Sequence, residues 1–277
     1  MSSYERYDQT SVHYDSTRWP TGIEIVLGCL GQSAAPLNQM TVLDAGCGTG
    51  NYAEAVLPHV AKIIAVDRSD GMLEVARQKL AAAADSGRIS FHQGEIDALP
   101  LPDASVDGVM INQVLHHLPD VGAEDWPAHR RVFTEFARVL KPGGVLTVNT
   151  CSHRQIEHAY WPYHLIPKAV EELLRRFMPL EQIEAALAEK GLRPRGRFVP
   201  VDAILQGADY LDPRGPLRRE WRAGDSIWAL VGEDELGYVE RTLRDLEARD
   251  ALDGYVAEHD APRPHLGQIT ILYAVKS

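Results

Sequence analysis

The sequence predicts an α/β protein with a doubly wound, mostly parallel sheet of seven strands and helical cap insertions. Two observations predict this fold class. Short apolar runs with polar ends alternate with helical patterns between residues 40 and 150, which is typical of a parallel sheet covered by helices. The segment Met40–Tyr52, MTVLDAGCGTGNY, then shows one such strand ending at Asp44 and passing through a glycine loop into a helix.

The glycine loop predicts a ligand site. Gly46, Gly48 and Gly50 occupy alternate positions. Glycine lets a loop adopt strained dihedral angles and lets a ligand lie against bare backbone, and the following helix offers unpaired N–H groups at its start. The next apolar run ends in a second carboxylate, Asp67, 23 residues after Asp44. Because an acid at about this spacing holds ribose hydroxyls in dinucleotide-binding folds, the pattern predicts a nucleoside cofactor.

Three more core strands are expected before residue 150. His92–Asp103 and Val106–Leu118 supply the third and fourth strands, each with a polar end. The next helix should be stopped by Pro142 and the two glycines that follow it, so that the fifth strand runs over Val145–Thr150.

The rest of the chain alternates between core elements and excursions. We expect a helix over Leu180–Lys190 that ends at Gly191, an extended run near Arg197–Val201, helical periodicity in Leu236–Ala257 and a last strand over Gln268–Val275. The chain is therefore divided into an N-terminal arm or lid (1–39), a cofactor-binding core (40–150), a cap insertion (151–178), a core continuation (179–201), a second cap insertion (202–266) and the last core strand (267–277). Both insertions leave from the carboxyl ends of strands, where doubly wound sheets bind ligands.

The glycine spacing favours one nucleoside cofactor over another. The third glycine follows the second by two residues, whereas the dinucleotide fingerprint requires three. Together with the later strands and their polar ends, the loop resembles the class I S-adenosylmethionine-dependent methyltransferases, in the branch that acts on small molecules. The resemblance covers residues 40–150 closely and residues 178–201 and 268–276 more loosely. It implies a Rossmann-like fold and S-adenosylmethionine as the cofactor.

The resemblance also implies a set of cofactor contacts. The glycine loop would wrap the methionine part, the acid after the second strand would bind the ribose diol, and residues near the third and fourth strands would contact the adenine and the methionine. An N-terminal Tyr-Asp segment would fold over the cofactor as a lid. Carried onto this sequence, the implied cofactor-binding residues are Asp44, Gly46, Cys47, Gly48, Gly50, Asp67, Arg68, Met72, Glu95, Ile96, Asn112 and Arg18. Glu95 stands where the family often has aspartate.

Candidates for the chemistry and for acceptor binding come from the arm, the strand ends and the insertions. A base is needed only if the nucleophile is a hydroxyl, an amine or an acidic carbon. His117 could instead hydrogen-bond the backbone, and the aromatic residues near Tyr160 could simply line a pocket. The candidate catalytic residues are Tyr14, His117, Tyr160 and His164, and the candidate substrate-binding residues are Trp161, Tyr163, Arg222, Asp225 and Trp228.

Two of these candidates belong to a wider pattern with a second interpretation. Trp221, Asp225 and Trp228 are spaced i, i+4 and i+7, so on a helix they would share one face. They then either line the acceptor pocket or pack the cap onto the core. Similarly, the basic stretch Arg214–Arg222 either grips an anionic acceptor or forms a solvated face.

Composition restricts the partners. The chain has 28 basic and 39 acidic residues, a net charge of −11 that disfavours nucleic acid as a substrate. No apolar run is long enough to cross a bilayer, and the first residues lack the blocks of a secretory signal, so we expect a cytoplasmic protein that binds no membrane. Three widely spaced cysteines predict neither a metal site nor disulfides. A nicotinamide-dependent oxidoreductase and a non-catalytic S-adenosylmethionine-binding regulatory protein remain alternatives.

Overall fold

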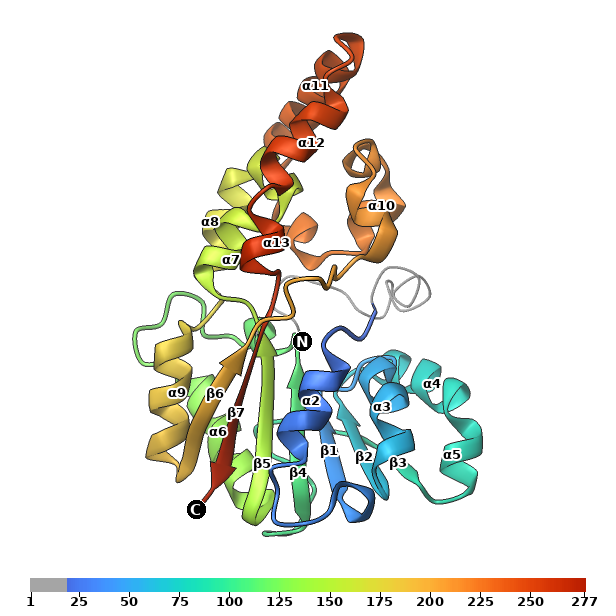
Figure 1. Cartoon of the computed structure of the whole chain (residues 1–277), viewed down its shortest axis with the longest axis vertical. Helices are drawn as coiled ribbons and strands as arrows, with labels where there is room; N and C mark the ends of the chain where they lie inside the picture. The colour runs from blue at the N-terminus through green and yellow to red at the C-terminus, as the bar shows by residue number, and fades with distance from the viewer. Residues whose placement is uncertain (1–18) are drawn as a thin grey trace.

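The computed structural model describes residues 19–277, and a seven-stranded sheet is the centre of this part of the chain (Figure 1). The strand order is β3-β2-β1-β4-β5-β7-β6, and neighbours are parallel except that β7 runs antiparallel to β5 and β6. This confirms the predicted doubly wound, mostly parallel sheet. The strands are β1 Thr41–Ala45, β2 Lys62–Asp67, β3 Ile89–Gln93, β4 Val106–Asn112, β5 Leu140–Thr150, β6 Leu192–Phe198 and β7 Thr270–Lys276.

Helices cover the two faces of the sheet and one of its ends (Figure 1). Those that pack beside the strands are α2 Ile23–Leu30, α3 Asn51–Val56, α4 Asp70–Lys79, α5 Ala81–Asp85, α6 Pro127–Val139 and α9 Leu180–Glu189. Those above the strand ends are α7 His153–His158, α8 Pro167–Leu174, α10 Arg219–Ala223, α11 Glu233–Ala248, α12 Leu252–Asp260 and α13 Arg263–Leu266. Short 3₁₀ helices η1 to η7 span Leu37–Gln39, Leu57–His59, Leu115–His117, Trp161–Leu165, Gly207–Leu211, Gly215–Leu217 and Ser226–Leu230.

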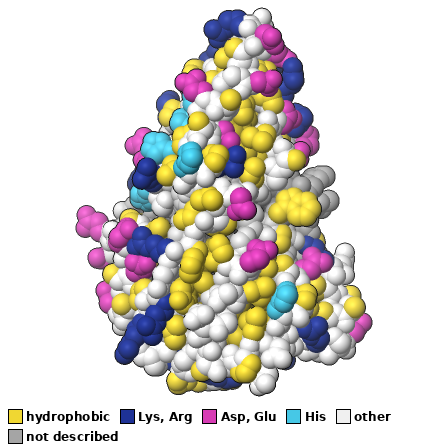
Figure 2. All heavy atoms as spheres, viewed as in Figure 1, with side chains coloured by type: hydrophobic (Ala, Val, Ile, Leu, Met, Phe, Trp, Pro, Cys, Tyr) yellow, Lys and Arg dark blue, Asp and Glu magenta, His cyan; other side chains and the backbone are white. Residues whose placement is uncertain are grey.

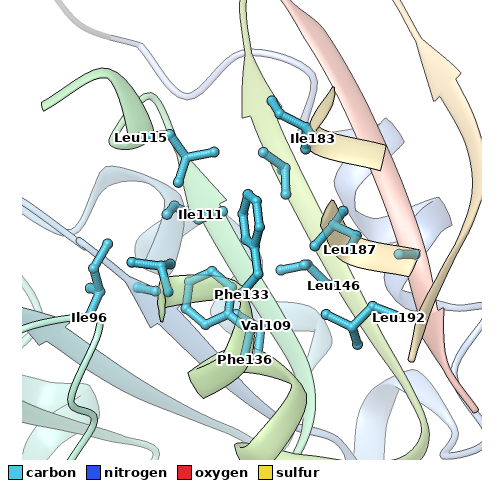
Figure 3. Close-up of a cluster of buried hydrophobic side chains, with 14 of the residues drawn as sticks. Ile96, Val109, Ile111, Leu115, Phe133, Phe136, Leu146, Ile183, Leu187 and Leu192 are labelled. Carbon is cyan, nitrogen blue, oxygen red and sulfur yellow. The ribbon is translucent and has the colours of Figure 1, made fainter. Parts of the chain in front are cut away.

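Alternation along the strands produces two separate cores, because successive side chains of a strand point to opposite faces. In β1, Val42 packs with the α2 and α3 side, whereas Leu43 packs with the α6 and α9 side. Phe133 and Phe136 of α6 and Leu187 of α9 form the centre of the second core (Figure 3). The sheet is thus buried on both faces, as the continuous apolar strands predict.

The strand order creates the crevice that positions the site. β1 and β4 are neighbours in the sheet, and the chain continues from β1 towards β2 and β3 but from β4 towards β5. In open α/β sheets ligands bind outside the carboxyl ends of the strands at this switch point. The loops that follow Ala45 and Asn112 therefore face each other across the crevice.

A third core lies in the helices above the strand ends. We call residues 151–178 the first cap segment and residues 202–266 the second cap segment, using the boundaries proposed from the sequence. Trp161 joins them, since its indole Nε1 donates to the carbonyl of Tyr210 at 2.6 Å and its backbone N–H donates to the Tyr210 hydroxyl at 3.0 Å. Gln155 connects the first segment to β7 by accepting from the Thr270 hydroxyl at 2.9 Å.

Two local predictions differ from the structure in their bounds. The helix before the fifth strand ends at Val139, and β5 already begins at Leu140, because Leu140 pairs with Val106. The next pair is Gly108 with Val145, so the extra residues around Pro142 form an irregularity in β5. The helical periodicity over 236–257 is confirmed, and it belongs to two helices, α11 and α12. The extended run near Arg197–Val201 is the end of β6, which ends at Phe198.

The predicted single helical face around Trp221 is also wrong. α10 ends at Ala223, and Asp225 begins the separate helix η7 by accepting from the N–H of Ile227. Gly224 marks the break, as expected for a residue that weakens helices. The two indoles meet edge to face, with ring centroids 5.8 Å apart, so they pack on each other instead of lying along one face.

Charge is dispersed over the surface seen in Figure 2, where acidic and basic side chains alternate over the sheet and the cap. The net charge of −11 is therefore not gathered into one patch on this face. Among residues 19–277, no helix is both long enough and apolar enough to cross a membrane.

Candidate functional site

A cavity of about 1180 Å³ lies at the carboxyl ends of the strands and reaches from the glycine loop to both cap segments. It exceeds the usual range of about 300 to 1,000 Å³ for small-molecule sites, so it has room for two ligands. Its wall includes most of the implied cofactor residues, namely Asp44, Gly46, Cys47, Gly48, Asp67, Arg68, Met72, Glu95, Ile96 and Asn112.

The three glycines of the loop have positive φ angles of 76°, 53° and 82°, yet their surroundings differ. A Cβ on Gly46 would lie 2.6 Å from the Val114 side chain, and a Cβ on Gly50 would lie 3.3 Å from Ala76. At Gly48 a Cβ would meet no described atom within 4 Å and would enter the cavity. Gly50 does not line the described cavity, and its cofactor contact stays a prediction. Its Cα side faces Leu80 and Ala76.

Asp67 holds the glycine loop in place. One carboxylate oxygen accepts from the Gly48 N–H at 2.8 Å, and the other accepts from the Ser69 N–H at 2.9 Å. Burial raises the pKa of Asp67 above its usual range, although these N–H donors act in the opposite direction. The carboxylate that the sequence predicts for the ribose therefore also shapes the glycine loop, and a carboxylate with four acceptor positions has capacity left for a ligand.

Asp44 and Asn112 bring unsatisfied polar atoms to the cavity wall. Within the described residues, Asp44 Oδ2 and both amide atoms of Asn112 are buried without a hydrogen-bond partner. Burial raises the pKa of Asp44 to about 8, and the Asp67 carboxylate adds to this shift. Buried polar groups are normally paired, so these atoms point to a ligand that completes them.

The far end of the cavity beside β2 and β3 is more exposed. Glu95 forms an ion pair with Arg68 at 3.5 Å, with both side chains partly in solvent. Met72 is buried on α4, whose first turn is capped by Ser69. Ile96 is buried beside Glu95. An apolar surface flanked by a carboxylate suits a planar heterocycle with an amino group.

The cap end of the cavity is aromatic. Tyr160 and Tyr163 stack, with ring centroids 4.4 Å apart and an interplanar angle of 9°. The Tyr163 hydroxyl donates to Asp225 at 2.9 Å, which joins the two cap segments across the cavity wall. His116 stacks on Phe177 at 4.5 Å, and His117 also lines the cavity. Of the sequence candidates, Tyr160, Tyr163, Asp225 and His117 thus gather here.

The remaining acceptor and catalytic candidates lie away from the cavity. Trp161 is fully buried inside the cap because its indole binds Tyr210, and Trp228 packs on Trp221. Arg222 donates to the Pro216 carbonyl at 2.7 Å, and His164 lies on the exposed side of η4 against His259. None of these four side chains lines the described cavity. Tyr14 and Arg18 lie outside the described residues.

Several cavity residues were missed by sequence reasoning. They share an uninformative local context, since they stand in loops or helices without a motif. Only Tyr52, directly after the glycine loop, and Gln113, directly after a strand with a polar end, carried a positional signal. The main omissions are Trp19, Tyr52, Gln113, Cys151, Phe177, Leu205 and Gln206.

Comparison with known proteins identifies the class of this domain. Residues 43–148 match the methyltransferase domain family. The malonyl-[acyl-carrier protein] O-methyltransferase of Yersinia pestis is 31% identical over 145 residues, which are 52% of this chain and 48% of the relative. The demethylmenaquinone methyltransferase of Symbiobacterium thermophilum is 37% identical over 106 residues, which are 37% and 39% of the two chains. The chain thus spans about half or less of the length of these relatives.

The fold likeness extends further than the sequence likeness. The crystal structure of a putative methyltransferase from an antibiotic biosynthesis pathway of Anabaena variabilis has a TM-score of 0.71 and 24% identity. It covers 94% of this chain and 99% of that one, so the caps as well as the sheet share its fold. Residues 43–148 therefore match the methyltransferase domain family, and the described fold resembles that of the Anabaena variabilis structure.

Proposed function

We propose that this protein transfers the methyl group of S-adenosylmethionine to a small-molecule acceptor by direct in-line displacement. One observation carries the proposal: a single cavity contains the glycine loop with its two carboxylates at one end and the tyrosine wall of the cap at the other. Direct transfer requires that donor and acceptor share one chamber in a fixed alignment.

The residues at the core end fit the cofactor. Gly48 leaves open the space that a Cβ would fill, and Asp44 and Asn112 would offer the charged methionine end polar atoms that no described residue pairs. Asp67 would accept from the ribose hydroxyls, and Glu95 and Ile96 would contact the adenine. When bound, the cofactor supplies a methyl carbon made electrophilic by its sulfonium. The alternatives of a nicotinamide enzyme and of a regulatory protein gain no support from the family match.

The residues at the cap end would hold the acceptor and exclude water. Burial raises the pKa of Tyr160 well above its usual range, and its hydroxyl donates to the Gln268 carbonyl at 2.9 Å. Tyr160 is therefore a protonated wall residue and not a base. His117 stays the proposed base for an acceptor that must lose a proton, while a thiolate or thioether acceptor needs none. Tyr14 and Arg18 stay our predicted lid residues.

The acceptor class is a small molecule with an oxygen, nitrogen, sulfur or carbon nucleophile. The two curated relatives described above are named for malonyl-[acyl-carrier protein] and for demethylmenaquinone, so their acceptors differ. The net charge of −11 supports a small molecule over nucleic acid. The cytoplasmic location stays a prediction, supported by cysteines without a CxxC pair.

Two measurements test the proposal. Calorimetry should show that S-adenosylmethionine binds the purified chain while NAD does not. S-adenosylhomocysteine release should then be measured over a panel of phenols, thiols, amines and carboxylic acids, with the cofactor alone as the blank. We expect at least one class to raise release above the blank. Cofactor binding without stimulation by any class would favour the regulatory alternative.

A further inference from the structure

Gln113 is held in a costly backbone conformation at the middle of the cavity wall. Its φ is +55°, one of four positive values among the non-glycine residues of the described chain. For a side chain other than glycine, asparagine or aspartate this conformation costs about 1 to 2 kcal/mol. Such outliers persist only where surrounding structure imposes them, and they cluster at functional sites.

Asn149, at the end of β5, imposes the conformation. The Gln113 N–H donates to the Asn149 carbonyl at 2.9 Å, and the Gln113 Nε2 donates to Asn149 Oδ1 at 2.9 Å. Asn149 is itself fixed, because it is buried and its Nδ2 donates to the Tyr52 hydroxyl at 2.8 Å. The hydroxyl of Tyr52 in turn donates to the Thr21 carbonyl at 3.1 Å. A continuous chain of hydrogen bonds thus orients the Gln113 carboxamide.

The carboxamide has hydrogen-bonding capacity that residues 19–277 do not use. Its Oε1 accepts one bond, from Cys151 Sγ at 3.7 Å, and its Nε2 donates one bond, to Asn149. A carboxamide has two N–H groups and two lone pairs on oxygen, so one donor and one acceptor position remain. Because Gln113 lines the cavity, these positions are available to a ligand.

The location of Gln113 indicates which ligand it meets. Its neighbour in sequence, Asn112, belongs to the cofactor end. Its side-chain partner Cys151 lies 3.6 Å (Sγ to hydroxyl) from Tyr160, which belongs to the aromatic cap end. We infer that Gln113 binds the acceptor, through an uncharged hydroxyl or carbonyl group next to the methylated atom, and that Asn149 is its positioning residue. This inference rests on the proposed function.

Gln113→Gly tests the inference, because it removes the carboxamide and also relieves the positive φ. The melting temperature should stay within a few degrees, while kcat/KM for an acceptor that bears such a group should fall about tenfold or more, as expected for one or two lost hydrogen bonds. The Kd for S-adenosylmethionine should change less than twofold. Gln113→Met, which keeps the length of the side chain, should reproduce the kinetic loss.

The matched control is Asp250→Gly. Asp250 has the same φ of +55° but lies in the exposed turn between α11 and α12. The change to glycine therefore relieves the same kind of backbone strain far from the cavity, and the acceptor KM should stay unchanged. If the wild type turns over, the proposed function holds. In that case, unchanged acceptor kinetics in Gln113→Gly, or a raised Kd for S-adenosylmethionine, would overturn the inference. Absence of turnover in the wild-type chain over the full panel would instead overturn the proposed function.

Discussion

The two ends of the cavity are built from contacts of different range. At the cofactor end, Asp67 holds Gly48 across 19 positions of the chain and Ser69 across two. At the acceptor end, Tyr163 reaches Asp225 across 62 positions, and Tyr160 reaches Gln268 across 108. The first end is made of backbone N–H groups and carboxylates in one local motif. The second is made of side chains that only tertiary packing brings together.

This difference separates binding of the common cofactor from choice of the acceptor. A local motif fixes loop geometry whatever the cap contains, so the cofactor end can be kept while the caps change. The cap has its own hydrophobic core, distinct from the two cores that flank the sheet. Variants at the two ends should therefore fail in different ways, cofactor affinity at one and acceptor kinetics at the other.

The largest effect is expected from Gly48→Val. Its branched side chain would occupy the space that the cofactor needs, and the Kd for S-adenosylmethionine should rise at least a hundredfold, about 3 kcal/mol. Gly50→Ala is the control, since its Cβ would press on Leu80 and Ala76 outside the cavity. Gly50→Ala should lose about 1 to 3 kcal/mol of stability, because alanine is strained at a positive φ. It should nevertheless bind the cofactor much more tightly than Gly48→Val does. Calorimetry showing equal losses would erase the distinction between the two glycines.

Asp44→Asn should lower the affinity for the cofactor and raise the stability of the cofactor-free protein. The folded pKa of about 8 lies far above the usual value of 3.8, so between about pH 4 and pH 8 the folded state keeps a proton that the unfolded state has lost. The stability of the cofactor-free protein should therefore fall as pH rises through this window, by an amount on the order of a few kcal/mol. The asparagine variant lacks this titrating group, so its stability should not fall with pH in this way.

Thermal unfolding from pH 5 to pH 9 checks the prediction. At pH 8 the Asp44→Asn protein should melt several degrees above the wild type without cofactor. Its affinity for S-adenosylmethionine should be lower, because no carboxylate faces the cationic methionine end. Parallel stability curves for the two proteins would show that Asp44 is ionised at little cost in the folded state.

Asp67→Asn should weaken the cofactor by about 1.5 to 3 kcal/mol, the range for hydrogen bonds to a charged group. An amide has one accepting oxygen, so it cannot hold both the Gly48 and the Ser69 N–H groups. The melting temperature should fall as well. Glu95→Gln serves as the comparison. Its ion pair with Arg68 is solvent-exposed, so we expect the loss of that pair to change the free energy of cofactor binding by less than about 1 kcal/mol. Titration calorimetry that ranks Glu95→Gln as the more harmful change would contradict this picture.

The sequence predicted the core better than the cap for the same physical reason. Strand periodicity and the loop from Asp44 to Gly50 are local, so the seven-stranded sheet and its crevice could be predicted from the residues alone. The end of α6 could not, because the pairing of Leu140 with Val106 across the sheet, and not Pro142, decides where the helix stops. Trp161 and His164 were chosen for chemical type, yet packing against Tyr210 buries one and leaves the other on the outer surface. No local sequence pattern predicts which of these two side chains is buried.

Asp225→Asn and Trp228→Phe give the smallest effects and compare two residues only three positions apart. Asp225 lines the cavity and accepts from Tyr163, so its amide variant should raise the acceptor KM several-fold and shift the melting temperature by no more than a few degrees. Trp228 packs on Trp221 outside the cavity wall, and its Nε1 is buried without a hydrogen-bond partner among residues 19–277. The phenylalanine variant leaves a small void but also removes that unpaired N–H, so we expect a stability loss of only about 1 kcal/mol and normal kinetics. If Trp228→Phe changed the acceptor KM at an unchanged melting temperature, the acceptor site would have to extend past Asp225 to the indole pair.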